Sequence, residues 1–279
     1  MRRTSSLRVI SGGCVFRVQG ASSSEHSAHV FKLILPLEAT LEISVDGVRY
    51  SLPAERGMIV PSNCQQQVHS GPARVTIMLD PETLGAGLRS FAMGGVTVVL
   101  GGNLGRQLRD FALAVFDAPL EDRSSVEAVT AEALQILGSA GLGRTLQIDS
   151  RVHMAMELFR QPWLDLDHRA VSKRAGISPG HLSHLFSRQL GLSAKRYSLW
   201  VRTVAALEHM GRGATATATA MMSGFSDLAH FSRECRRHFG HPPSKLPMSC
   251  AQVFAGCYGS ERSWLPSRSM CSSSVPSQA

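Results

Sequence analysis

Between residues 29 and 80 the chain alternates short apolar runs with turn residues, a pattern typical of a sheet. The runs are HVFKLILPL, TLEISVDGVRYSLP, GMIVPSN and ARVTIMLDP. Asp46 and Gly47 separate LEISV from VRYSL, and an Asp-Gly pair supplies the two positive φ angles of a type I′ hairpin turn. Several short strands at this spacing predict a small antiparallel sandwich or barrel.

The apolar spacing changes to a helical period after residue 103. One face of the predicted helix carries Leu104, Leu108, Phe111 and Val115. This a/d-like spacing predicts a pairing helix and therefore a homodimer, with packing inside the chain as the alternative. A second amphipathic stretch follows at 124–138, and the glycine-rich segment 138–145 is the best candidate for a linker.

Two later segments, 168–197 and 216–246, repeat one plan. Each predicts a short helix, a glycine turn and a second helix that ends at another glycine, Gly191 or Gly240. The residues expected to point inward are Leu182, Leu185 and Phe186 in the first repeat and Leu228, Phe231 and Phe239 in the second. Each repeat is a candidate helix-turn-helix unit, whose second helix enters a major groove of DNA.

A single predicted helix connects the two repeats. It runs from about Ser193 to Met210 and spans roughly 25 Å at about 1.5 Å per residue. With the width of the flanking units added, the two second helices can reach adjacent faces of the major groove, about 34 Å apart.

Charge is concentrated in the same part of the chain. The 279 residues carry a net charge of +8 and are 43% apolar, enough for two domains with their own cores. Residues 148–247 contribute +7, whereas residues 1–147 are neutral overall. A local excess of Lys and Arg fits a polyanion such as DNA, and a merely solvated basic face is the alternative.

The repeats also resemble a known family. AVSKRAGISPGHLSHLFSRQLGLSAKRYSLWVR and SGFSDLAHFSRECRRHFGHPPSKL are similar to the double helix-turn-helix domain of AraC/XylS-type transcription regulators over about a hundred residues. The resemblance implies an α+β protein with a cupin-like N-terminal β-sandwich or barrel, linking helices and an all-α DNA-binding domain. The expected divisions are 1–103 for the sensing domain, 104–147 for the linking helices, 148–247 for the double helix-turn-helix domain and 248–279 for a Ser-rich, largely disordered tail.

The family motif, carried over position by position, gives the residues expected to contact DNA. Those expected to face base edges are Ser183, His184, Ala229, Ser232 and Arg233. Those expected to contact phosphate are Arg188, Arg236, Arg237 and Lys245. Arg233 is the strongest because a guanidinium can donate two bonds to guanine, although contact with phosphate or an acidic neighbour is the alternative. For the residues expected to contact phosphate, the alternative is that they form an exposed basic face in contact with solvent only.

Several positions depart from the family pattern. Ala216, Thr219 and Cys235 are smaller than the residues usual there, which predicts a less tightly packed second unit. Gly180 and His184 replace side chains that often read a base, which predicts poor discrimination by the first unit. We therefore expect the second unit to carry most of the base discrimination.

The sequence gives little support for a metal site, a catalytic site or a membrane-spanning segment. A cupin metal site needs closely spaced histidines, but His26, His29, Glu38 and His69 lack the H-x-H spacing, so we expect no metal, no other cofactor and no catalytic site. No apolar run is long enough to span a membrane, and the cysteines form no C-x-x-C pair, which favours a reduced, cytoplasmic protein.

The expected function is sequence-specific regulation of transcription. The expected partners are double-stranded DNA, a small-molecule effector, a second copy of the chain and, for an activator, RNA polymerase. Two alternatives remain: a cupin-type enzyme that carries an accessory basic domain, and a regulator without a ligand.

Overall fold

The computed structural model describes residues 5–10, 12–83, 97–117, 131–132, 135–136, 148–161, 164, 166–246 and 252–253. Its first half is built from two sheets. The larger has strand order β10-β1-β2-β8-β3-β6-β9 and the smaller β5-β4-β7. The larger sheet contains β1 (Ser6–Ile10), β2 (Gly13–Val18), β3 (Lys32–Pro36), β6 (Gly57–Val60), β8 (Arg74–Leu79), β9 (Val98–Leu100) and β10 (Gln252–Val253). The smaller contains β4 (Leu41–Val45), β5 (Val48–Leu52) and β7 (Gln66–Ser70).

The hairpin between β4 and β5 confirms the turn predicted from Asp46 and Gly47. Val45 pairs with Val48, and the two turn residues have φ angles of 48° and 80°. Both positive angles match a type I′ turn, which brings the two strands back at the right-handed twist of the sheet.

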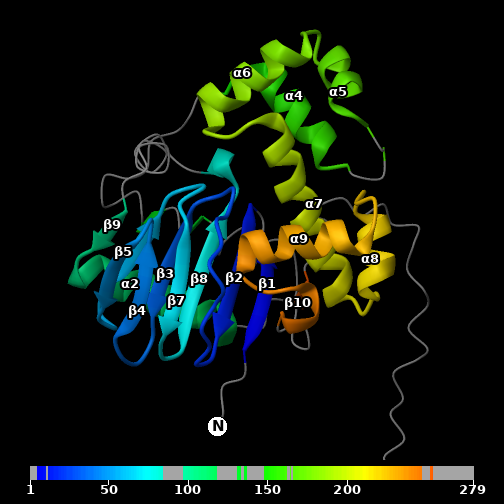
Figure 1. Cartoon of the computed structure of the whole chain (residues 1–279). Coiled ribbons are helices and arrows are strands. Elements are labelled where there is room, and N and C mark those ends of the chain that lie inside the picture. The colour runs from blue at the N-terminus through cyan, green and yellow to red at the C-terminus, as the bar shows by residue number, and fades with distance from the viewer. Residues whose placement is uncertain are drawn as a thin grey trace, which may run out of the picture.

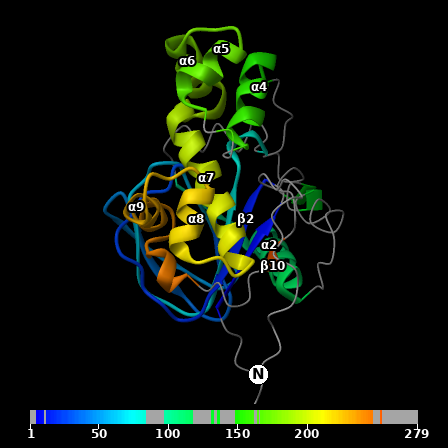
Figure 2. The same ribbon diagram turned by 90° about the vertical axis from the view of Figure 1, so that its right-hand side faces the viewer.

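Alternating side chains give the larger sheet two different faces. Val75 and Ile77 of β8 point to a core that α2 (Gly102–Asp117) covers through Leu108 and Phe111. On the opposite face, Ile34 and Met58 pack on the smaller sheet, while Phe16 and Met78 join the core of the helical half. Figure 2 shows α2 and α9 on opposite sides of the sheet.

The packing of α2 corrects the reason given for a homodimer. Leu108 and Phe111 are 0% and 6% exposed against the chain's own sheet, so this face is occupied within the chain. The structure therefore follows the alternative of intrachain packing for these two residues.

The second half is helical. Its elements are α4 (Ser150–Phe159), α5 (His168–Arg174), α6 (Pro179–Leu190), α7 (Ala194–Gly211), α8 (Ala216–Met222), α9 (Leu228–Phe239) and the 3-10 turn η3 (Pro243–Lys245). Figure 1 shows α4, α5 and α6 grouped beyond one end of the sheet, with α7 running back from them to α8 and α9 beside β1. Both predicted repeats and the long connecting helix are confirmed.

Capping residues explain where these helices begin and end. Ser178, Ser193 and Asp227 each accept a hydrogen bond from the backbone N–H three residues later, which satisfies a donor at the helix start. At the other end, Gly191 and Gly240 take φ angles of 76° and 74°, a left-handed conformation that favours glycine.

One expectation needs correction, another holds with an unexpected partner, and two strands are additional. Leu228 is 37% exposed and does not point inward, because it is the first residue of α9 and lies beyond the buried stripe. Phe239 is buried, but its ring meets Phe16 of the sheet, so its partner lies outside its own helical unit. Strands β1 and β2 were not expected from the sequence.

Other expectations fall partly outside the described residues. The linker 138–145 lies there entirely, as does most of the helical stretch 124–138. Within the tail, Gln252–Val253 forms a short strand that pairs in parallel with β1. No helix in the described part of the chain is both long and apolar enough to cross a membrane.

Candidate nucleic-acid interface

The second helix of the first unit, α6, separates an apolar side from a polar one. Its buried residues are Leu182, Leu185, Phe186 and Leu190. Ser183, His184 and Arg188, which the sequence assigned to DNA, are all exposed. Gly180 is exposed as well, with open space where a side chain would stand. The polar side of α6 therefore presents one long cationic side chain among short or neutral ones.

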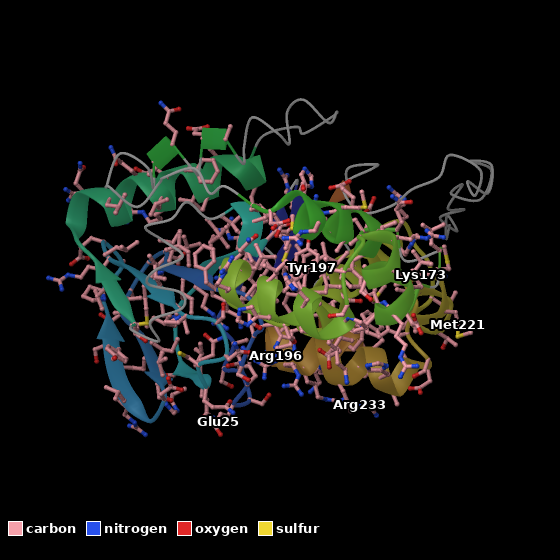
Figure 3. All side chains as sticks on the ribbon, turned by 90° about the horizontal axis from the view of Figure 1, so that it is seen from above. Glu25, Lys173, Arg196, Tyr197, Met221 and Arg233 are labelled. Atoms are coloured by element: carbon pink, nitrogen blue, oxygen red, sulfur yellow. The ribbon has the colours of Figure 1, made fainter. Side chains whose placement is uncertain are left out.

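The second helix of the second unit, α9, has a more basic exposed side. Ala229, Arg233, Arg236 and Arg237 are exposed and Ser232 is half-buried. Figure 3 shows Arg233 on the outer side of α9, away from α7. Lys245 of η3 is exposed as well. Arg237 is only partly free for another partner, because its Nε lies 3.6 Å from Glu234 Oε1.

The buried side of α9 is unusual for a helix of this kind. Phe231 and Cys235 are fully buried, and the Phe231 ring lies 5.3 Å from that of Phe225. Burial raises the pKa of the Cys235 thiol, which is therefore unreactive. Glu234 and His238 lie on the same stripe, at 6% and 0% exposure. The buried stripe of α9 thus contains two ionisable residues besides its apolar ones.

Comparisons with known proteins agree with this geometry. A family model described as a helix-turn-helix domain matches residues 171–247. A solved structure of a probable AraC family transcriptional regulator from Rhodopseudomonas palustris CGA009 is 30% identical over 36% of this chain and 95% of its own, with a TM-score of 0.33. The chain belongs to the AraC family. It is therefore a DNA-binding regulator of transcription with helix-turn-helix units.

Solved structures of a whole regulator show the same overall fold. ToxT from Vibrio cholerae O395 is 12% identical, with a TM-score of 0.54 over 84% of this chain and 96% of its own. ToxT from strain SCE256, solved with a bound unsaturated fatty acid, is 11% identical, with a TM-score of 0.52 over 88% and 96%. A comparison with curated proteins finds no match.

In this AraC-family chain the helical half is attached to the sheet half through a buried polar network. Trp200 Nε1 of α7 donates to Asp80 Oδ1 at 2.6 Å, and the Tyr197 hydroxyl donates to Glu82 Oε1 at 2.6 Å. Arg160, at the end of α4, donates to Glu82 Oε1 and lies 3.4 Å from Asp80 Oδ2. Two carboxylates from the end of β8 and the following turn thus hold three side chains of the helical half.

Burial changes the protonation of this network. Burial and the charge of Asp80 raise the pKa of Glu82 to about 7, although Arg160 opposes the shift. Burial also raises the pKa of Tyr197 well above its ordinary value, so its hydroxyl remains a donor. Nothing in the sequence links these residues, because 120 positions separate Asp80 from Trp200.

A second attachment holds the C-terminal end of α9 on the sheet. The rings of Phe239 and Phe16 meet edge to face at 5.7 Å, and the Ser24 hydroxyl donates to the Gly240 carbonyl at 2.7 Å. A Cβ on Gly240 would lie 2.9 Å from His26 Nδ1 and would clash. Gly240 is thus required both for its left-handed φ angle and for this close approach.

The residues considered for a cupin-type metal site are not brought together. His69 Nε2 bonds the Ser44 hydroxyl in the smaller sheet, and Glu38 is exposed. His26 contacts Lys32 Nζ at 2.8 Å and Gln66 Nε2 at 3.2 Å. The described residues instead place His29 beside two residues of α9, a grouping that the sequence did not suggest.

Proposed function

We propose that α6 and α9 are the helices with which this regulator reads DNA. The base-facing residues in this proposal are Ser183, His184, Ala229, Ser232 and Arg233. The phosphate-contacting residues are Arg188, Arg236, Arg237 and Lys245. The observation that carries the proposal is the separation of sides on each helix, since the buried stripe faces the protein and the proposed residues lie on the exposed side.

We also propose that the two helices differ in what they read. Arg233 can donate two hydrogen bonds to the O6 and N7 atoms of guanine, whereas Ser183 and His184 offer fewer bidentate contacts. Arg236 and Arg237 add positive charge on α9, which strengthens binding to any sequence. Base discrimination would therefore come mainly from the second unit.

The experiment is selection of bound sites from random duplex DNA by the whole chain. Two enriched blocks with centres about one helical turn, roughly 10 base pairs, apart are expected if both helices enter the same face of the duplex. Measured affinity for the selected site should fall steeply as salt rises, because cationic contacts release counterions from DNA. Enrichment of no sequence at moderate salt would contradict the proposal.

For the N-terminal half we propose a sensor of a small carboxylic acid. One ToxT structure holds an unsaturated fatty acid and another holds (E)-4-(8-methylnaphthalen-1-yl)but-3-enoic acid. Lys32 supports the same chemistry here: it is 2% exposed, and within the described ranges no ion pair joins it to a carboxylate. Burial lowers the pKa of the Lys32 amine well below its ordinary value, and a bound carboxylate would raise it again by stabilising the charged form.

Calorimetry tests the sensor by measuring the affinity of the whole chain for a long-chain fatty acid. Lys32→Met keeps the length of the side chain and removes its amine, so binding should weaken strongly, while Arg49→Met on exposed β5 should bind as the wild type does. Equal binding by wild type and Lys32→Met would contradict the role of Lys32. Failure of the wild type itself to bind would contradict the proposed fatty-acid sensor.

The remaining proposals concern the domain divisions, the oligomeric state, the location and the lack of enzymatic activity. The proposed divisions are a sensing domain at 1–103, linking helices at 104–147 and the DNA-binding domain at 148–247. A homodimer would have to form through a surface other than the buried face of Leu108 and Phe111. We place the regulator in the cytoplasm, in contact with RNA polymerase if it activates transcription, and we propose no enzymatic activity.

A further inference from the structure

Three buried side chains meet where α9 lies against the sheet half. His29 precedes β3, while Glu234 and His238 are one turn apart on α9. Glu234 Oε2 lies 3.8 Å from His29 Nε2 and 3.8 Å from His238 Nε2. The exposed fractions are 4%, 6% and 0%, and one ligand atom from each residue lies within 4.8 Å of the others.

These atoms are too far apart to satisfy one another. A hydrogen bond to oxygen requires about 2.7 to 3.2 Å, so separations of 3.8 Å leave the lone pairs unused. Among the residues that the structure describes, Glu234 Oε2 and both ring nitrogens of His238 have no hydrogen-bond partner. Buried polar atoms are almost always paired, so Glu234 Oε2 and His238 Nε2, which face each other at 3.8 Å without a hydrogen bond, indicate a missing partner.

Protonation of the histidines does not supply that partner. Burial lowers the pKa of His29 to about 4 and that of His238 well below its ordinary value, so both rings are neutral near pH 7. The contacts with Glu234 are therefore not ion pairs at that pH. Neutral imidazole is, however, the form in which histidine binds a metal.

A residue outside the cluster orients one of the rings. Asn63 Oδ1 lies 3.3 Å from His29 Nδ1, which favours a proton on Nδ1 and directs the Nε2 lone pair toward Glu234. Ligating histidines usually have such a partner on the nitrogen that does not bind the metal. The backbone of Asn63, which has a φ angle of 65°, is held by a hydrogen bond from its N–H to the Ala28 carbonyl at 2.7 Å.

Neighbouring charges leave room for a cation. Arg237 lies 3.6 Å from Oε1 of Glu234, so the other carboxylate oxygen, Oε2, keeps its lone pairs. Lys32 and His26 also act on His238, but burial lowers the pKa of each, which favours their uncharged forms. Arg196 of α7 is a further cation, and its charge also lowers the pKa of His29.

We propose that His29, Glu234 and His238 bind one divalent first-row transition metal ion, with zinc the best fit, and that this ion clamps α9 to the sheet half. Two imidazole nitrogens and one carboxylate oxygen are a common ligand set for zinc, with water at the fourth position. Zinc bonds of about 2.0 to 2.1 Å in a tetrahedron separate ligands by about 3.3 Å. The two separations of 3.8 Å from Glu234 Oε2 have to close by about half an ångström, and the histidine nitrogens, within 4.8 Å of one another, have to approach as well.

The test measures zinc bound to the whole chain after treatment with a chelator and reloading. The wild type should retain one zinc ion per chain by elemental analysis, and a competition titration should give its affinity. His29→Ala and Glu234→Gln should each lose this stoichiometric binding. His69→Ala is the matched control, since His69 lies in β7 on the smaller sheet and should bind zinc as the wild type does.

A cobalt-loaded sample shows whether these three residues are the ligands. Cobalt(II) in a tetrahedral site absorbs visible light, and this absorption should vanish in Glu234→Gln while circular dichroism shows a folded protein. Asn63→Gly removes the orienting side chain and tolerates the positive φ angle, so zinc affinity should fall by about tenfold to a hundredfold.

Hydrogen exchange tests the clamp separately. Zinc should slow hydrogen exchange of the α9 amides in the wild type. It should not change the exchange rate of these amides in Glu234→Gln, because the ion joins α9 to the sheet half only when all three ligands are present. Trace zinc in the wild type, or equal binding by wild type, His29→Ala and Glu234→Gln, would overturn the site; unchanged exchange would overturn the clamp. None of these measurements uses DNA, so their failure would leave the proposed function intact.

Discussion

The two helix-turn-helix units follow one plan but differ in what lies behind their second helices. α6 and α9 are both 12 residues long, with a side-chain cap before them and a left-handed glycine after them. Behind α6, the Phe186 ring meets those of Phe159 and Tyr197, which belong to the helical half. Behind α9, Phe239 meets Phe16 of the sheet.

Because of this difference, the two units are attached to the sheet half in different ways. The first unit packs on α4 and α7, and the network of Asp80 and Glu82 holds those helices to the sheet half. The second unit touches the sheet half directly, through the buried side of α9. Any ligand or ion that changes the sheet surface under α9 can therefore act on the second unit without passing through the first.

The largest expected effect comes from breaking the attachment that both units share. Asp80→Ala leaves the buried indole N–H of Trp200 without its acceptor and removes one of the carboxylates that surround Arg160. Removing one member of a buried charged network costs about 3 to 5 kcal/mol, which urea unfolding of the whole chain would measure. Asp110→Ala is the control, because Asp110 is exposed on α2 and should change stability by less than about 0.5 kcal/mol. Equal effects of the two substitutions would show that the network does not hold the halves together.

The same attachment should make stability depend on pH. The pKa of Glu82 is about 7 in the folded chain, compared with an ordinary value of 4.5, so the folded state keeps a proton that the unfolded state has lost. Stability should therefore fall as pH rises from about 4.5 to 7, by up to about 1.4 kcal/mol per pH unit. Glu82→Gln should flatten this part of the curve, measured by urea unfolding at a series of pH values. A slope that is unchanged in the variant would assign the pH dependence to other groups.

The next effect compares base reading by the two units. Arg233→Ala should weaken binding to the selected site by about 1 to 3 kcal/mol and relax the preference at one base pair, because the bidentate contact is lost. His184→Ala should leave the selected motif nearly unchanged. Fluorescence anisotropy and repeated site selection on both variants measure the difference. If His184→Ala changes the motif while Arg233→Ala does not, base discrimination belongs to the first unit.

Local signals in the sequence predicted the helical half well. Gly176 and Gly224 both take the positive φ angles that their turns require, and Gly191 and Gly240 end their helices as predicted. In the sheet half, strands that alternate or follow a turn residue were predicted, but β2 was not. Every residue of β2 except Val18 is buried, so alternation does not mark it, and it lies outside the series of turn-bounded apolar runs at 29–80 that identified the fully buried strands β3, β6 and β8.

Contacts between the halves could not be predicted in the same way. Glu234 lies in a basic stretch of sequence where an acidic residue suggests a surface ion pair, and His29 suggests part of a cupin site. Their shared burial depends on how α9 packs on the sheet, a relationship across about two hundred positions that no periodicity records. Thus the proposed base-facing positions follow from the motif, while the groups that connect the sheet half and the helical half require the structure.

The smallest expected effect concerns phosphate contacts, and it asks whether both units lie on DNA at once. Arg188 of α6 and Arg236 of α9 are both exposed near the C-terminal end of their helices, so they form a matched pair. Each substitution by Ala should weaken binding to all sequences by less than about 1 kcal/mol and reduce the salt slope by about one unit. Anisotropy titrations at several salt concentrations, with the selected site and a scrambled duplex, would measure both slopes. If only Arg188→Ala changes the slope, α9 remains away from the phosphates while the first unit binds. If only Arg236→Ala does, the second unit binds alone, and in either case the two helices cannot be reading adjacent grooves together.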